Sequence, residues 1–186
     1  MGEEKLTDLL QNVLSIAGDI PVVAAGGIGD PEAAKRYMTL GASGVLCGSR
    51  FVASQESQAH DDYKRAIIEA GSNETVRSIC FDLGWKNAPH RTIRNSTFRM
   101  WERAGFPTIG NRPGEGDIIL NTKQGLELPR YAMMPPKQGM GGDPLAAALY
   151  AGSGIDRIDS ILAARDIVKM FADALLFGSN GAKFAN

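Results

Sequence analysis

Two glycine turns, each at the end of a short apolar run, constrain the fold of this chain more than any other feature of the sequence. The first run, Val22 to Ala25, stops at Gly26-Gly27, and the second, Val45 to Cys47, stops at Gly48-Ser49. Neither run alternates with polar residues, which is typical of parallel strands that are covered on both faces. The pattern therefore predicts two buried parallel strands, each followed at once by a glycine turn.

The segment between the two runs carries the signals of a helix. Asp30 can cap it, Pro31 suits its first position, and Gly41 stands where the chain must leave it. A helix between two strands is the usual connection of neighbouring parallel strands. Both glycine turns are therefore expected at the carboxyl ends of two adjacent parallel strands.

This arrangement predicts a phosphate-binding site. Glycine has no Cβ, so its backbone N–H groups can approach an anion closely, and a helix that starts after Gly48-Ser49 adds its positive end. Glycine pairs are often plain tight turns, but here two turns and the intervening helix agree. In (β/α)8 barrels the recurrent phosphate site uses the loops after the last two strands and the start of a short extra helix.

The same stretch resembles the nitronate monooxygenase family of FMN-dependent barrel enzymes. The resemblance rests on PVVAAGGIGD, on GASGVLCGSRFVASQES and on AHDDYKRAIIEA. Flavin-dependent enoyl reductases and NADH:quinone reductases share this pattern. The resemblance implies an FMN cofactor whose phosphate is held by Gly26, Gly27, Leu46, Cys47, Gly48 and Ser49. Leucine at position 46 can hydrogen-bond the flavin only through its backbone, whereas Ser49 keeps a hydroxyl donor.

The expected fold class is α/β, as the C-terminal part of a (β/α)8 TIM barrel. The phosphate loops would follow strands 7 and 8, and the helix expected over residues 5–17 would be the sixth barrel helix. An extension made mostly of helices and loops would follow the barrel part. The domains expected are residues 1–72, the barrel part, and residues 73–186, the extension. A complete barrel typically needs about 250 residues.

Two parallel strands leave apolar faces and open edges. We therefore expect half of a longer protein, which could also pair as a homodimer or with a complementing N-terminal half. The alternative is a small complete α/β domain, in which strands expected at 76–81 and 117–120 join the same sheet.

The remaining chain is less regular. Helices are expected at 58–70, at 96–103 after the cap Asn95, at 144–150 and at 160–176. Residues 106–143 are rich in Gly and Pro and could form either a lid or a linker. The segment AGSGIDRI resembles the family's Tyr-Ala-Gly-x-Gly turn, which implies a place near the flavin.

Composition excludes several classes of function. A net charge of −1 gives no basis for binding nucleic acid or a membrane surface. No apolar run approaches the roughly 20 residues of a membrane span, and the acidic start is unlike a signal peptide. Two cysteines and two histidines predict neither a metal site nor a disulfide framework, which fits a cytoplasmic location.

No catalytic residue is predicted. The family's base is a histidine in a Gly-His-x-Gly segment, which this sequence lacks. His60 is expected to face solvent among charged residues, and His90 to contact backbone in a loop. Arg50 could clamp the phosphate or pair with a carboxylate of the following helix, and Cys47 is expected to act as a small apolar filler.

The function that the resemblance implies is the FMN-dependent oxidation of alkyl nitronates or nitroalkanes, with O2, to a carbonyl compound and nitrite. Two alternatives remain open. One is an FMN-dependent NAD(P)H reductase of quinones or enoyl thioesters, and the other is a non-catalytic fragment or half-barrel. Both enzyme hypotheses imply a small-molecule substrate.

Overall fold

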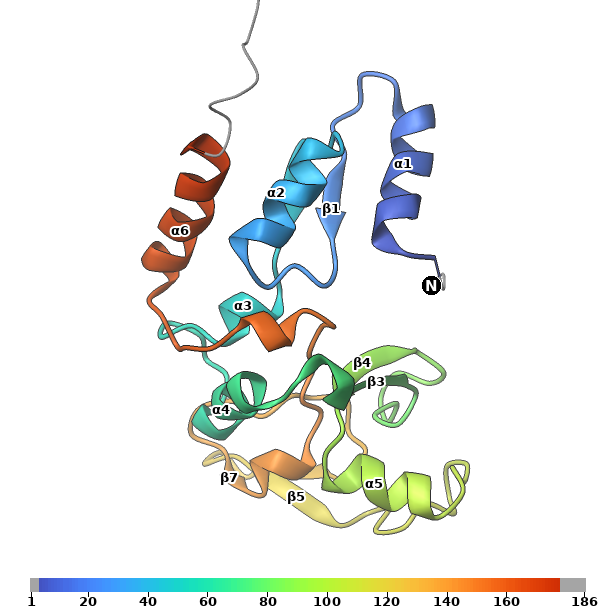
Figure 1. Cartoon of the computed structure of the whole chain (residues 1–186). Coiled ribbons are helices and arrows are strands. Elements are labelled where there is room, and N and C mark those ends of the chain that lie inside the picture. Colours follow the sequence, from blue (N-terminus) through green and yellow to red (C-terminus); the bar gives the residue numbers. More distant parts are fainter. Residues whose placement is uncertain (1–3, 178–186) are drawn as a thin grey trace, which may run out of the picture.

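A strand-helix-strand unit forms the upper part of the molecule (Figure 1). The computed structural model describes residues 4–177, so the outer bounds of the two expected domains lie outside the described residues. The elements of this part are α1 (Leu6–Ala17), β1 (Val23–Ala25), α2 (Pro31–Thr39), β2 (Gly44–Leu46) and the single turn α3 (Ser49–Val52). β1 and β2 pair in parallel, with Ala24 opposite Val45. The strand-helix-strand prediction is therefore confirmed.

Local signals set the ends of α2. The Asp30 carboxylate accepts a hydrogen bond from the Ala33 N–H at 2.7 Å, and Pro31 occupies the first turn. The chain leaves the helix at Gly41, whose φ of +106° is strained for any residue with a Cβ. Asp30 is thus the helix cap that the sequence predicted.

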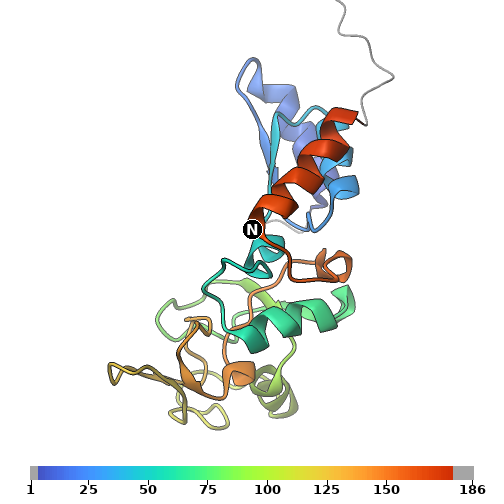
Figure 2. The ribbon, with the colours of Figure 1, turned by 90° about the vertical axis from the view of Figure 1, so that its left-hand side faces the viewer.

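The last helix of the chain returns to this upper part. α6 (Ala164–Phe177) packs beside α2, which both ribbon views show (Figures 1 and 2). Ile167 and Phe171 are buried in one cluster with Leu10, Ala24 and Ala34. α6 begins at residue 164 rather than 160, because Leu162 forms a β-bridge with Ser54.

The lower part of the molecule combines short helices with antiparallel strands. β3 and β4 form one sheet, and a second sheet has the order β6-β5-β7. The elements are α4 (Asp61–Glu69), β3 (Thr75–Ser78), β4 (His90–Ile93), α5 (Ser96–Arg103), β5 (Ile118–Asn121), β6 (Glu127–Pro129) and β7 (Gly141–Gly142). Single 3-10 turns lie at Ser72–Glu74, Pro144–Ala146 and Ile155–Arg157.

Several expectations for this part need correction. The helix expected from residue 58 begins at Asp61, because Ala59 pairs with Lys137 and His60 forms the cap. The helix expected at 144–150 is only one 3-10 turn. Three strands give order to the 106–143 segment, which the sequence left as lid or linker. The alternative of one shared sheet is wrong, because within residues 4–177 β1 and β2 pair only with each other.

The β1-β2 pair does not close into a barrel. Its outward side chains are exposed, with 58% of Val23 and 65% of Leu46 accessible to solvent. The structure is therefore α/β as expected, whereas the place of the two strands in a barrel stays a prediction.

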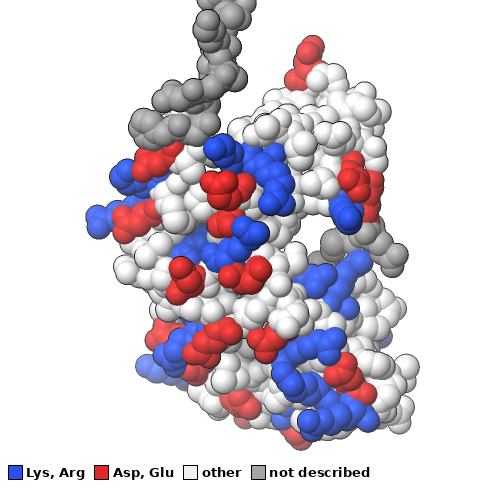
Figure 3. Space-filling model, viewed as in Figure 1, with Lys and Arg blue, Asp and Glu red and all other residues white. Residues whose placement is uncertain are grey.

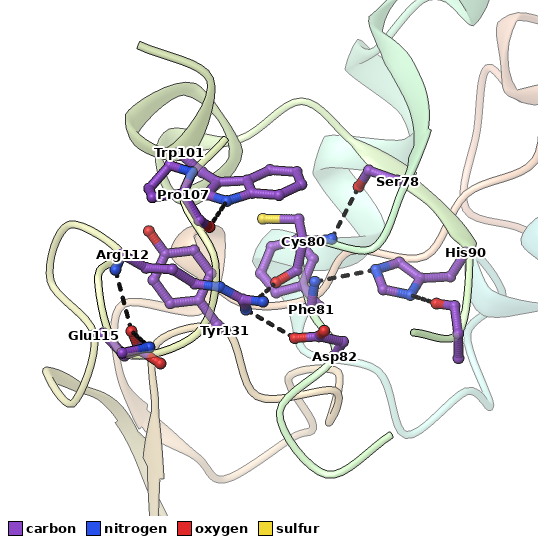
Figure 4. A network of polar contacts seen from close by, with 12 residues as sticks. Ser78, Cys80, Phe81, Asp82, His90, Trp101, Pro107, Arg112, Glu115 and Tyr131 are labelled. Atoms are coloured by element: carbon purple, nitrogen blue, oxygen red, sulfur yellow. Dashed lines mark hydrogen bonds and ion pairs between the residues drawn. The ribbon is translucent and has the colours of Figure 1, made fainter. Parts of the chain in front are cut away.

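A buried ion pair organises the core of the lower part (Figure 4). Arg112 Nη1 donates to Asp82 Oδ1 at 2.8 Å and to the Cys80 carbonyl at 3.2 Å. The guanidinium also lies over the rings of Trp101 and Tyr131, at 5.9 and 5.2 Å from their centroids. The Trp101 indole donates to the Pro107 carbonyl, so this buried ring packs in the same core.

The surface carries mixed charge. On the face in Figure 3, acidic and basic side chains are interspersed, except at the upper right, which is mostly uncharged. No helix among residues 4–177 has the length and apolarity needed to cross a bilayer.

Candidate functional site

A cavity of about 400 Å3 lies at the carboxyl ends of β1 and β2. All six residues predicted to hold a phosphate line it, namely Gly26, Gly27, Leu46, Cys47, Gly48 and Ser49. The parallel pairing of the strands brings the two turns together, as the sequence indicated. Binding of a cofactor by these residues remains a prediction.

Each turn exposes backbone in a different way. Gly26 and Gly27 have φ values of +116° and +68°, so both adopt conformations that a side chain disfavours. At Gly48 the φ is −95°, and an added Cβ would meet no atom within 4 Å. The first turn needs glycine for its conformation, whereas Gly48 in the second turn has open space where a Cβ would stand.

A third glycine loop completes the cavity. Gly152 and Gly154 line it, more than 100 residues beyond the second turn. The Gly152 N–H donates to Ser49 Oγ at 2.9 Å. A Cβ on Gly154 would lie 2.2 Å from the Gly27 carbonyl oxygen, so the two loops pack backbone against backbone.

Sequence reasoning placed this third loop near a flavin only by family resemblance, and it named none of its residues as site residues. Ile28, Gly29 and Ile158 were also missed as lining residues. The sequence Gly-Ser-Gly at 152–154 was the one pattern that could have indicated a further glycine turn at the site. Its contact with Gly27 is non-local and could not be derived from spacing.

The cavity favours a ligand bound by backbone donors. Among the described residues no charged side chain lines it, and its side-chain walls include Ile28, Leu46 and Ile158. The Ser49 hydroxyl accepts from Gly152, which leaves its own hydrogen to donate. Successive backbone N–H groups in such turns form anion-binding concavities. α3 spans only four residues, so its dipole adds little.

Cys47 is half-buried in the cavity wall. Burial raises the pKa of its thiol, so it is a thiol rather than a thiolate near neutral pH. This state fits the expected apolar filler better than a nucleophile.

Arg50 does not line the cavity. Its buried side chain donates from Nη2 to the Ser160 carbonyl at 2.9 Å, and thereby links α3 to the segment before α6. Burial lowers its pKa, and the charge of Asp159 opposes this effect. Both expectations for Arg50, the phosphate clamp and the pairing with a carboxylate of the next helix, are therefore wrong.

Neither histidine reaches the cavity. His60 Nδ1 accepts from the Asp62 N–H at 3.2 Å and caps α4. His90 Nε2 accepts from the Phe81 N–H at 3.2 Å, so Nδ1 carries the proton and donates to the Ala88 carbonyl at 2.9 Å (Figure 4). His90 therefore contacts backbone, as predicted, but it is the first residue of β4 rather than a loop residue. Among residues 4–177, no group of three or more His, Cys, Asp or Glu is placed to hold a metal ion.

The neutral state of His90 should make stability depend on pH. Burial lowers its pKa, and the hydrogen bond to Ala88 and the charge of Asp82 only partly oppose this effect. Below the unfolded pKa of about 6.5, the unfolded chain binds the proton more readily, so stability falls as the pH drops. We expect urea unfolding midpoints to decrease from pH 7 to pH 5, and this decrease to be smaller in His90→Gln. An unchanged slope in that variant would contradict the assignment.

The chain matches one family along most of its length. The family model described as nitronate monooxygenase covers residues 1–173. The nitronate monooxygenase of Pseudomonas aeruginosa is 43% identical over 145 residues, which are 78% of this chain and 37% of that relative.

The chain also resembles solved structures, including the two that follow. FabK from Thermotoga maritima has a TM-score of 0.68 at 25% identity, with 96% of this chain and 51% of that chain covered. The nitroalkane oxidase from Streptomyces ansochromogenes has a TM-score of 0.65 at 26% identity, with 93% and 44% covered. The chain thus spans about half of these solved chains or less, and less than half of the curated relative.

Proposed function

Because the chain belongs to the nitronate monooxygenase family, whose members are oxidoreductases, we propose that its glycine cavity binds the phosphate of FMN. The proposed activity is the oxidation of alkyl nitronates by O2 to a carbonyl compound and nitrite. We also propose that β1 and β2 are the seventh and eighth strands of a TIM barrel. The observation that carries the proposal is the meeting of three glycine loops around one cavity.

The residues present fit the phosphate group. Gly48 leaves open space where a Cβ would stand, and Ser49, which lines the cavity, keeps a hydroxyl hydrogen to donate. Uncharged backbone N–H groups can bind the phosphate on the side that faces the protein, while its other side stays in contact with water. When bound, the flavin supplies the electron transfer, and the protein supplies position and electrostatics.

The described residues bind and orient rather than transfer a proton. The cavity is lined by glycine, apolar residues, Cys47 and Ser49, and none of these is a general base at neutral pH. The part of this chain in the reaction is therefore to hold the cofactor by its phosphate. Nitronate turnover is an activity that we propose for the whole protein.

Alkylation of Cys47 tests the cavity directly. Cys47 lines it, whereas Cys80 is buried elsewhere, where burial raises its pKa to about 12. We expect N-ethylmaleimide to modify Cys47 faster than Cys80 in the folded chain, and saturating FMN to slow the modification of Cys47 about tenfold, measured by peptide mass spectrometry. Riboflavin, which lacks the phosphate, should protect weakly at the same concentration. Equal labelling with and without FMN would contradict the proposal.

A second candidate is an FMN-dependent NAD(P)H reductase of quinones or enoyl thioesters. The likeness to FabK is as strong as that to the nitroalkane oxidase, so the fold alone does not choose between the two candidates. Stopped-flow reduction of the loaded protein distinguishes them. Rapid bleaching of the flavin by NADPH supports the reductase. Bleaching by ethyl nitronate but not by NADPH supports the nitronate-oxidising enzyme.

The exposed sheet face supports a third proposal, a half-barrel that pairs with a second copy or a complementing N-terminal half. Val23 and Leu46 would be covered in such a complex. Light scattering checks the homodimer, and a monomeric mass at micromolar concentration would exclude it.

A further inference from the structure

The third glycine loop, which includes Gly152 and Gly154 and forms one wall of the cavity, belongs to the lower part of the molecule. Its apolar residues Ile155 and Ile158 are fully buried, in a cluster with Tyr63, Ile67 and Leu149. The first two walls are carried instead by the β1-β2 unit, whose core is a separate cluster. The width of the cavity therefore depends on how the two parts are held together across it.

An ion pair between side chains crosses this junction, in addition to the hydrogen bond from Gly152 to Ser49. Arg157 Nη1 donates to Asp30 Oδ2 at 2.8 Å, although the two residues are 127 positions apart. The second oxygen of Asp30 accepts from Ala33 and caps α2. Asp30 follows Gly29 directly, and a Cβ on Gly29 would lie 2.1 Å from the Gly154 carbonyl oxygen. The carboxylate thus connects the cap of α2, the first turn and the third loop at one point.

We propose that Arg157 is a positioning residue for the cofactor cavity, which acts through Asp30 to hold the third loop against the first turn. This inference rests on the proposed function, because it concerns the affinity of the same site. The Arg157 side chain lies outside the cavity lining and is 47% exposed, so its effect on the ligand is indirect.

The ion pair should matter more for the ligand than for global stability. Exposed ion pairs contribute little to the free energy of unfolding, because solvent screens them and ordering two long side chains has an entropic cost. A small displacement of a binding wall nevertheless lowers affinity strongly, because the donors leave their required positions. Loss of Arg157 should therefore weaken FMN binding with little change in the melting temperature.

The test compares FMN affinity in the full chain and three variants. We expect Arg157→Met to raise the dissociation constant about threefold to fivefold, measured by quenching of flavin fluorescence. Arg157→Lys should restore most of the affinity, because an ammonium group can still pair with Asp30. The control Arg165→Met removes an arginine that pairs with its neighbour Asp166 in α6 and should bind like the parent.

Salt and hydrogen exchange supply readouts that a general loss of stability would not reproduce. High salt should weaken FMN binding in the parent and in Arg157→Lys, but less in Arg157→Met, because the screened pair is already absent. Without FMN, amides 152–158 should exchange faster in Arg157→Met than in the parent, whereas those of α6 should not.

The outcomes separate the two proposals. A parent chain that does not bind FMN overturns the proposed function. A parent that binds FMN, with Arg157→Met equal to it in affinity, salt response and exchange, overturns the positioning role alone. If Arg157→Met does not fold, the affinity of Arg157→Lys and the salt response of the parent still test the proposal. FMN affinity of the parent that does not change with salt would contradict the role of the ion pair.

Discussion

Gly154→Ala is expected to weaken FMN binding at least about tenfold, because the added methyl group has no space between two walls of the cavity. The added Cβ would lie 2.2 Å from the Gly27 carbonyl oxygen and 2.8 Å from its carbonyl carbon. These are backbone atoms of the opposite turn, so rotation of a side chain cannot relieve the clash. The third loop must therefore move by about 1 Å, a displacement that is large for a binding wall.

The backbone conformation of Gly154 makes this a steric test. Its φ of −97° is accessible to alanine, so strain in its own dihedral angles adds nothing. Gly152→Ala is the matched variant in the same loop, because its Cβ would meet Ser49 Oγ and Gly27 at ordinary contact distances of 3.6 and 3.7 Å.

We expect Gly152→Ala to fold like the parent and to lose less affinity than Gly154→Ala. Isothermal titration with FMN and thermal melting of both variants measure the difference. Equal affinity of the two variants would show that the contact between Gly154 and Gly27 does not shape the cavity.

Arg112→Met is expected to lower the free energy of unfolding by about 3–5 kcal/mol. The change leaves the Asp82 carboxylate in the interior without its cation, and the two side chains are only 3% and 2% exposed. It also removes the guanidinium that lies over Trp101 and Tyr131. A domain of ordinary stability has about 5–15 kcal/mol in total, so this loss is a large fraction of it.

The double variant Asp82→Leu with Arg112→Met distinguishes an unpaired charge from lost packing. An apolar pair of similar volume removes the buried charge, so the double variant should be more stable than Arg112→Met alone. Lys169→Met, which breaks an exposed pair with Asp173 in α6, should cost only about 0.3–0.5 kcal/mol. Guanidinium unfolding of the three variants measures these values, and a double variant less stable than Arg112→Met would contradict the explanation.

Local hydrogen bonds explain what the sequence predicted well. Helix α5 begins and ends where the pattern placed it, because Asn95 accepts from the Phe98 N–H and the chain turns at Gly105 with a φ of +78°. The Asp30 cap is likewise made within one helical turn. These contacts join residues close in sequence, so residue type and spacing were sufficient to predict them.

Contacts between distant residues explain what the sequence did not predict. Arg50 donates to a carbonyl 110 residues away, and Arg112 pairs with a carboxylate 30 residues away. The strands between residues 118 and 142 are short and irregular, with a register shift between Ile118 and Leu120. Such segments have no periodicity that could reveal their partners.

The sequence by itself determined the strand-helix-strand unit, its caps and the two glycine turns that meet at one edge. Those features depend on backbone propensity and on interactions within a few residues. Only the tertiary structure decided that Gly152 and Gly154 close the cavity, that Arg157 reaches Asp30, and that α6 packs on α2. These contacts form between segments that the chain must first bring together from more than 100 residues apart, and no local pattern encodes which segments will meet.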